Sequence, residues 1–123
     1  MKEGQKLWTR DELILAINLY CKLPFGKLDK NTKEVRELAA LLGRTSNSVA
    51  LKLVNFSSLD PSLQARGIKG MGNASKLDKQ VWDEFYDNWD AALIESEKML
   101  ARVTHTTIEK MNDAEEINIS QNG

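Results

Sequence analysis

Two short amphipathic segments separated by only Gly43 and Arg44 constrain the fold of this chain more than any other feature. Apolar residues recur at three- and four-residue spacing in both segments, first as Val35, Leu38, Ala39 and Leu42 and then as Val49, Leu53 and Phe56. This spacing predicts two helices, each with one apolar face to bury. Glycine ends the first helix and Thr45 can cap the second. Two short helices joined this closely through a glycine have the pattern of a helix-turn-helix, here over residues 34–56.

Capping signals mark the starts of the helices. A Ser, Thr or Asn followed three residues later by an acidic side chain can form a capping box, and three such pairs stand before a sustained apolar period: Thr9 with Glu12, Asn31 with Glu34, and Ser75 with Asp78. Together with the apolar periodicity, they predict helices over about residues 10–23, 32–42, 46–56 and 76–103. The expected fold class is therefore all-α: a three-helix unit that contains the helix-turn-helix, followed by a long C-terminal fourth helix.

Two segments lack a sustained apolar period. Residues 57–75 are rich in turn-forming residues, so we expect a loop between the helix-turn-helix and the long helix. Loops of this length inside a compact domain are uncommon and are often functional. Residues 104–123 have scattered apolar residues, which predict a frayed tail or a linker. One helical domain is therefore expected over residues 7–103.

The formal net charge is −1, but the charges are unevenly distributed. Residues 1–75 hold 12 Lys and Arg against 7 Asp and Glu, whereas residues 76–123 hold 5 against 11. A basic N-terminal half can attract a phosphate backbone at short range, because fields are screened beyond about 8 to 10 Å at physiological salt. The acidic half would repel DNA, so we expect the fourth helix to lie away from a duplex, as a brace or a partner surface.

The helix predicted over residues 46–56 has a polar face opposite its apolar one. Four residues share this polar face: Asn47, Ser48, Leu51 and Asn55. In the major groove, Asn can make paired hydrogen bonds to adenine, Ser can bond to any base edge, and Leu51 can contact the methyl group of thymine or of a modified cytosine. We therefore predict that these residues contact DNA bases. The alternative is that Leu51 and Val54 pack against the fourth helix and that the polar residues only face water.

Several cationic and polar residues are candidates for phosphate binding. Arg44 and Thr45 lie at the N-terminus of the same helix and Lys52 lies within it, so they are placed to hold phosphates. Arg66 and Lys69 are interleaved with three glycines and could bring backbone N–H groups and two positive charges to a phosphate. This segment is neither GxGxxG nor a P-loop, so a flexible connector is the alternative interpretation.

Residues for catalysis are scarce. The chain has one His, His105, and one Cys, Cys21, so it offers no paired histidines for a metal site or a nuclease centre. Cys21 falls on the apolar side of the first helix and is expected in the core. We therefore predict no catalytic residue, no metal site and no cofactor.

The sequence also bears on the compartment. The N-terminus lacks the apolar stretch of a secretory signal, and no segment approaches ~18 uninterrupted apolar residues. A single Cys excludes an intramolecular disulfide and suits a reducing compartment. We expect a cytoplasmic protein without membrane contact.

Residues 8–12, 42–49 and 53–56 resemble a Myb/SANT-type three-helix module. A more specific resemblance, over residues 7–102, is to the N-terminal region of a bacterial family of HNH restriction-type endonucleases. The segments that carry it are residues 19–27, 53–56, 59–61, 64–70 and 73–75. In that family the nuclease domain, with its metal-binding histidines, follows on the C-terminal side, and its motif is absent from this chain. The resemblance implies an N-terminal fragment of such an enzyme or a freestanding copy of its targeting region.

The resemblance implies that this region recognises double-stranded DNA. The leading hypothesis is a DNA-targeting module of an HNH restriction-type endonuclease, with the nuclease domain in the same polypeptide. The alternatives are a SANT-like protein-interaction module and a freestanding DNA-binding regulator. Surface charge separates the two classes: a basic stripe on the exposed side of the helix over residues 46–56 favours DNA, and an acidic or apolar one favours protein.

We predict that this chain does not cleave DNA. It has no paired histidines to hold a catalytic Mg²⁺, Mn²⁺ or Zn²⁺ ion. Plasmid DNA incubated with the purified chain and each metal should remain supercoiled on an agarose gel. Nicking that persists through repeated purification would contradict this prediction.

Overall fold

The computed structural model describes residues 7–65, 67 and 74–122, with side chains described up to residue 106 except that of Gln64. All regular secondary structure in this part of the chain is helical, which confirms the all-α fold class. The elements are α1 (Arg10–Lys22), the 3-10 helix η1 (Phe25–Lys27), α2 (Lys33–Leu42), α3 (Ser46–Ser57), α4 (Pro61–Ala65), α5 (Lys76–Asp87) and α6 (Trp89–Asn122).

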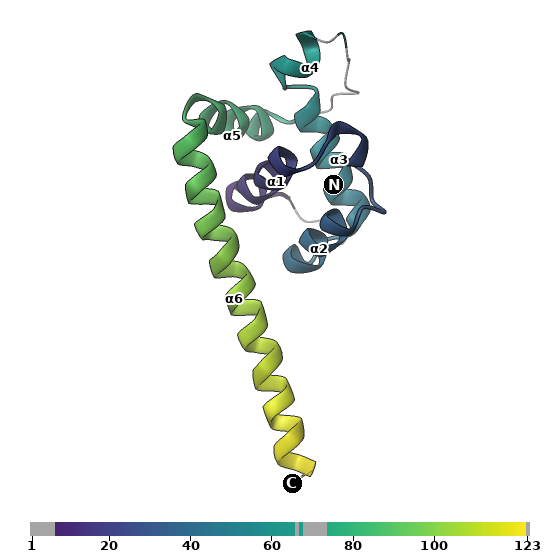
Figure 1. Cartoon of the computed structure of the whole chain (residues 1–123), viewed down its shortest axis with the longest axis vertical. Coiled ribbons are helices and arrows are strands. Elements are labelled where there is room, and N and C mark those ends of the chain that lie inside the picture. The colour runs from purple at the N-terminus through teal and green to yellow at the C-terminus, as the bar shows by residue number, and fades with distance from the viewer. Residues whose placement is uncertain (1–6, 66, 68–73, 123) are drawn as a thin grey trace.

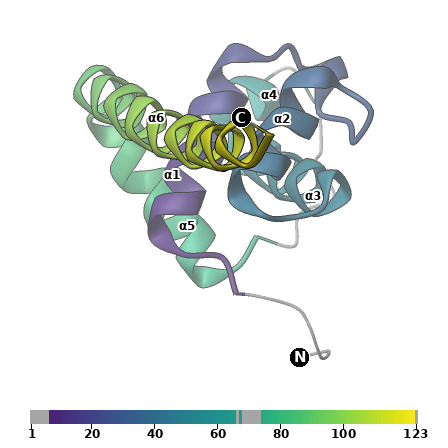
Figure 2. The ribbon, with the colours of Figure 1, turned by 90° about the horizontal axis from the view of Figure 1, so that it is seen from below.

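The first helix is the centre of the structure. α1 contacts α2, α3, α5 and α6, and Figures 1 and 2 show these helices arranged around it. Its residues 15–19 are all buried, so the helix is covered on every side over this stretch. Apart from Asn18, these residues are Leu, Ala and Ile, the composition expected of a helix with no solvent face. The predicted capping box is confirmed: Glu12 N donates to Thr9 Oγ1 at 3.2 Å, and Thr9 N donates to Glu12 Oε1 at 3.0 Å.

The turn between α2 and α3 forms where the sequence predicts it. Gly43 has a φ of 68°, in the left-handed region that glycine adopts without steric cost. Arg44 N donates to Ala39 O at 2.9 Å, which closes the end of α2. Thr45 then caps α3, because its Oγ1 accepts a hydrogen bond from Ser48 N at 3.1 Å. Helices α2 and α3 pack against each other and against α1.

The capping box predicted at Asn31 is wrong. α2 begins after Thr32, whose side chain makes no capping hydrogen bond. Asn31 N instead donates to Asp29 Oδ1 at 3.2 Å, in a turn that precedes the helix. The Asp29 carboxylate thus binds the backbone of this segment. It lies two residues before Asn31, the cap that the sequence pattern favours.

The single long fourth helix is also wrong, because Asn88 divides it. Asn88 has φ −129° and ψ 48°, outside the helical region, and α5 and α6 run in different directions (Figure 1). Both helices pack against α1, so both direct their apolar side chains to the same core. The apolar spacing therefore continues across the break and conceals it. Beyond the break, α6 extends to Asn122, over residues for which a frayed tail or linker was expected.

The segment expected as a loop contains the short helix α4. Pro61 occupies its first position, where proline's missing N–H and fixed φ are compatible with a helix. Asp60 Oδ1 accepts hydrogen bonds from Ser62 N at 2.9 Å and from Ser62 Oγ at 2.7 Å. Leu63 is buried and anchors α4 to the rest of the structure. The pair Asp60-Pro61 was a helix-start signal in the sequence.

A buried polar contact joins α6 to α1. Asn18 Nδ2 donates to Ser96 Oγ at 2.9 Å and to Glu97 Oε1 at 3.0 Å, and both Asn18 and Ser96 are buried. Ser96 Oγ in turn donates to Leu93 O at 2.8 Å. Because each buried polar group has a partner, the helices approach closely without an unsatisfied donor.

Phe85 and Trp89 should differ in their contributions to stability. Phe85 is 2% exposed, whereas Trp89 is 36% exposed. Phe85→Ala should lower the free energy of unfolding by about 3 to 5 kcal/mol, because it leaves a cavity in the core. Trp89→Ala should lower the free energy of unfolding by clearly less than Phe85→Ala does. Urea unfolding of both variants measures the difference, and equal losses would mean that the junction of α5 and α6 is packed differently.

Candidate functional site

The outward face of α3 is the first candidate site. Asn47 is exposed and Leu51 is 57% exposed, while Ser48 and Asn55 beside them are partly buried. The apolar residues of the same helix, Val49, Leu53 and Phe56, are fully buried. The two faces of α3 thus lie as predicted, and Leu51 is not covered by a fourth helix. This outward face is uncharged. It is neither the basic stripe that would favour DNA as the partner nor the acidic stripe that would favour a protein.

Arg44 is not placed to hold a phosphate. Its Nε donates to Glu12 Oε2 at 2.9 Å and its Nη2 to Glu12 Oε1 at 2.8 Å, a bidentate ion pair. Nη2 also donates to Leu7 O at 2.9 Å, and the guanidinium lies 4.3 Å from the centre of the Trp8 ring. The side chain is only 7% exposed. Arg44 thus joins the turn before α3 to the start of α1, and we correct its predicted phosphate role.

Lys52 also forms an ion pair within the fold. Its Nζ lies 3.1 Å from Asp78 Oδ1 and 3.0 Å from Asp78 Oδ2, and the two side chains are 13% and 1% exposed. Asp78 also accepts a hydrogen bond from Ser75 N at 3.0 Å, so the same carboxylate caps α5 and binds α3. The predicted phosphate role of Lys52 is therefore corrected too: its charge holds α5 against α3. Separating a largely buried lysine from such a carboxylate costs several kcal/mol.

Three further residues are predicted to bind phosphate. Thr45 is exposed, and its side chain is engaged in capping α3. Arg66 and Lys69 lie outside the described residues. Of the four cations predicted to bind phosphate, the two that the structure describes are thus both engaged in ion pairs within the fold.

Exposed cations instead precede and line α2. Lys27, Lys30, Lys33 and Arg36 are all exposed, and none of them forms an ion pair with another described residue. Sequence reasoning missed this group, because it concentrated on the helix that follows the turn. The signal was present as four positive charges within ten residues.

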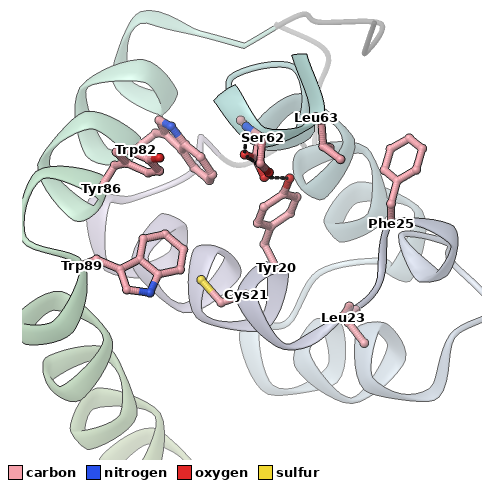
Figure 3. Close-up of a pocket in the computed structure, with 10 residues that line it drawn as sticks. Tyr20, Cys21, Leu23, Phe25, Ser62, Leu63, Trp82, Tyr86 and Trp89 are labelled. Atoms are coloured by element: carbon pink, nitrogen blue, oxygen red, sulfur yellow. Dashed lines mark hydrogen bonds between the residues drawn. The ribbon is translucent and has the colours of Figure 1, made fainter. Parts of the chain in front are cut away.

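An aromatic pocket is the second candidate site. It has a volume of about 630 Å³ and lies where α1, η1, α4, α5 and α6 meet. In the view of Figure 3, Tyr20 separates the aromatic side chains Trp82, Tyr86 and Trp89 from Leu23, Phe25 and Leu63. Phe25, Tyr86 and Trp89 are 45%, 47% and 36% exposed, so the pocket is open to solvent. This pocket could not be predicted from the sequence, because its residues come from five separate elements.

The pocket does not activate Cys21. Burial raises the pKa of this thiol to about 11, and the nearby Asp60 carboxylate contributes to the increase. A nucleophilic cysteine needs the opposite shift, because the thiolate is the reactive form. Burial also raises the pKa of Tyr20, whose hydroxyl donates to Asp60 Oδ2 at 2.6 Å. Both groups therefore stay protonated near neutral pH.

Neither a group of metal-ligating side chains nor a membrane-spanning helix occurs among the described residues. No three His, Cys, Asp or Glu side chains there lie close enough together to hold a metal ion. None of the helices in the described ranges combines the length and the apolar character needed to cross a membrane. Comparison with protein-family models, with curated proteins and with solved structures finds no match to this chain.

The ion pair between Arg44 and Glu12 should stabilise the fold in the absence of DNA. Arg44→Met keeps an apolar stem against Trp8 but leaves the Glu12 carboxylate unpaired. We expect it to lower the free energy of unfolding by about 3 kcal/mol at neutral pH. Urea unfolding measures this loss, and an unchanged stability would return Arg44 to the candidate phosphate contacts.

The same pair should make stability depend on pH. The hydrogen bonds from Arg44 are the largest cause that lowers the pKa of Glu12 below its ordinary value of 4.5, against an opposing effect of burial. A lowered folded-state pKa gives stability that is present above the unfolded-state pKa and is lost as pH falls through the folded-state value. The original chain should therefore lose more stability than Arg44→Met between about pH 5 and pH 3. Parallel losses would contradict this assignment.

Proposed function

We propose that this chain is a DNA-targeting module in which α3 enters the major groove of double-stranded DNA. The observation that carries this proposal is the outward face of α3, where exposed Asn47 and Leu51 lie on a rigid helix that no other helix covers. Asn and an apolar side chain are suited to the amide and methyl groups that bases present in that groove. The two partly buried ion pairs around α3 hold it in position, so that the face is preorganised.

Phosphate contacts would come from the cations of α2 and the residues before it. In a helix-turn-helix complex, the first helix of the pair crosses the sugar-phosphate backbone while the second lies in the groove. Lys30, Lys33 and Arg36 occupy the corresponding region and are exposed. These contacts replace those expected of Arg44 and Lys52, whose charges are engaged within the fold.

The acidic helices support the same orientation. Asp83, Glu84 and Asp87 on α5 and Asp90 on α6 are exposed, and they would be repelled by phosphates. α5 and α6 would therefore lie away from the duplex. We propose further that α6 leads toward an HNH nuclease domain, as the resemblance of residues 7–102 implies, and that the cleaving activity belongs to that domain.

A protein-interaction module is the second candidate function. It is favoured by the lack of charge on the outward face of α3 and by the exposed rings of Phe25, Tyr86 and Trp89. Aromatic side chains are enriched where proteins meet, whereas a monomeric protein seldom leaves several of them together at its surface.

DNA binding can be tested with two matched charge variants. Lys33→Gln/Arg36→Gln and Lys98→Gln/Arg102→Gln each remove one Lys and one Arg, the first pair from α2 and the second from α6, and all four side chains are exposed. Fluorescence anisotropy with a labelled duplex, near 50 mM salt and at micromolar protein, measures the affinity. Contact with three or four phosphates predicts a slope of log K against log salt of about −3.

The α2 variant should weaken binding to every duplex and make this slope less steep by about two, while the α6 variant should bind as the original chain does. Equal weakening by both variants would mean that binding follows net charge alone, and no binding of the original chain would favour the protein-interaction function.

Asn47→Ala should lower the free energy of DNA binding by about 1 to 3 kcal/mol on a preferred sequence only. Gln80→Ala, an exposed amide on α5, is its control.

A further inference from the structure

The aromatic rings that line the pocket have two main orientations. The Trp82 and Tyr86 rings are nearly parallel, with centroids 6.0 Å apart and an angle of 23° between their planes. Trp89 is turned by 76° from Tyr86, and Tyr20 by 81° from Trp82. The centroids of these contacting pairs are 5.4 to 6.0 Å apart, so the rings pack against one another and a ligand cannot lie between them. The aromatic surface open to a ligand is what this packing leaves uncovered, chiefly on Phe25, Tyr86 and Trp89, which are 45%, 47% and 36% exposed.

A carboxylate accompanies these rings. Asp60 lines the pocket and accepts three hydrogen bonds, from Tyr20 Oη at 2.6 Å, from Ser62 N at 2.9 Å and from Ser62 Oγ at 2.7 Å. All three donors are neutral, so the negative charge is oriented but not cancelled. No Lys or Arg of the described residues forms an ion pair with Asp60. Lys22, which follows Cys21 on α1, is paired with Glu97.

We propose that the aromatic pocket binds an organic cation, an ammonium group that carries methyl or other alkyl substituents. The faces of aromatic rings attract cations, and alkyl substituents on the ammonium cover exposed aromatic surface that a hydrated ion would not. The Asp60 carboxylate supplies the charge complement. Because the Tyr20 hydroxyl donates a hydrogen bond to that carboxylate, its ring becomes richer in electrons and more attractive to a cation.

The size and the charge of the pocket exclude other ligand classes. Its volume of about 630 Å³ lies within the range of small-molecule sites and exceeds that of a trimethylammonium group alone, so the ligand has an apolar body as well. An anion such as phosphate would meet Asp60 and no lining cation. A neutral apolar ligand would leave the negative charge of Asp60 without a counter-ion. The cation can be a free metabolite or a methylated lysine side chain of a protein, which share this chemistry.

A matched pair of probes tests the charge requirement. Choline and 3,3-dimethylbutan-1-ol have the same shape, but only choline is charged. The full chain is titrated with each probe up to about 10 mM while the indole N–H signals of the three tryptophans are followed by NMR. Choline should bind at least about tenfold more tightly, as expected for a desolvated cation over aromatic rings. Equal affinity, or no shift of any indole signal with choline, would overturn the proposal.

Variants locate the site. Asp60→Asn retains an oxygen that can accept the bonds from Tyr20 and Ser62 but removes the charge, and it should remove most of the preference for choline. Trp89→Leu keeps an apolar side chain at a partly exposed position and should weaken choline binding by about tenfold. Ile94→Ala changes a residue that is 58% exposed on α6 and should leave binding unchanged. Unchanged choline binding by both pocket variants would contradict the assignment.

Two peptides distinguish the sources of the cation. A short peptide with trimethyllysine and the same peptide with unmodified lysine are titrated under the same conditions. Tighter binding of the trimethyllysine peptide than of choline would assign the pocket to a modified protein, and the reverse order would assign it to a small metabolite. If the peptide with unmodified lysine bound more tightly than the trimethyllysine peptide and choline, this would contradict a site for alkylated ammonium groups. DNA binding through α3 can fail without affecting these outcomes, because none of the variants changes α3.

Discussion

Burial of α1 on all sides is the constraint on which the rest of the structure depends. Residues 15–19 have no solvent face, so helices from both the N-terminal and the C-terminal halves of the chain must cover them. α2 and α3 cover one side, and α5 and α6 cover the others (Figure 2). The three N-terminal helices therefore do not bury their core alone. The acidic C-terminal half completes the same domain, as the single domain expected over residues 7–103 requires.

Two partly buried ion pairs determine what α3 can offer to a partner. Arg44 with Glu12 and Lys52 with Asp78 each join α3 or its preceding turn to another helix, and both cations lie over the Trp8 ring, at 4.3 Å and 5.4 Å from its centre. The charges that make this region basic in sequence are thereby neutralised inside the fold. What remains outward on α3 is Asn47 and Leu51, which can recognise shape and hydrogen-bonding groups but cannot attract a polyanion. Among the described residues, a polyanion would instead be attracted by exposed cations such as those of α2 and of the segment before it.

The sequence predicted the helices and their faces well, and the contacts between charged side chains poorly. Local signals account for the successes: the Thr9 and Ser75 capping boxes and the Gly43 turn depend only on neighbouring residues. The break at Asn88 could not be predicted from periodicity, because both flanking helices bury their apolar residues against α1. The roles of Arg44 and Lys52 could not be predicted either, since their partners lie 32 and 26 residues away. The aromatic pocket depends on the same long-range assembly.

The pocket and the outward face of α3 are connected through the core, yet they are expected to act independently. Phe56 of α3 stacks on Trp82, and Trp82 in turn contacts Tyr20 and Tyr86 of the pocket. Such a chain of packed rings transmits a displacement only if one of its members has two stable arrangements that the two ligands favour unequally. Phe56 is fully buried, Trp82 is 3% exposed, and α3 is further held by the Lys52 ion pair. The structure shows these rings in one close-packed arrangement, so the physical continuity between the two sites is not by itself a ground for coupling between them.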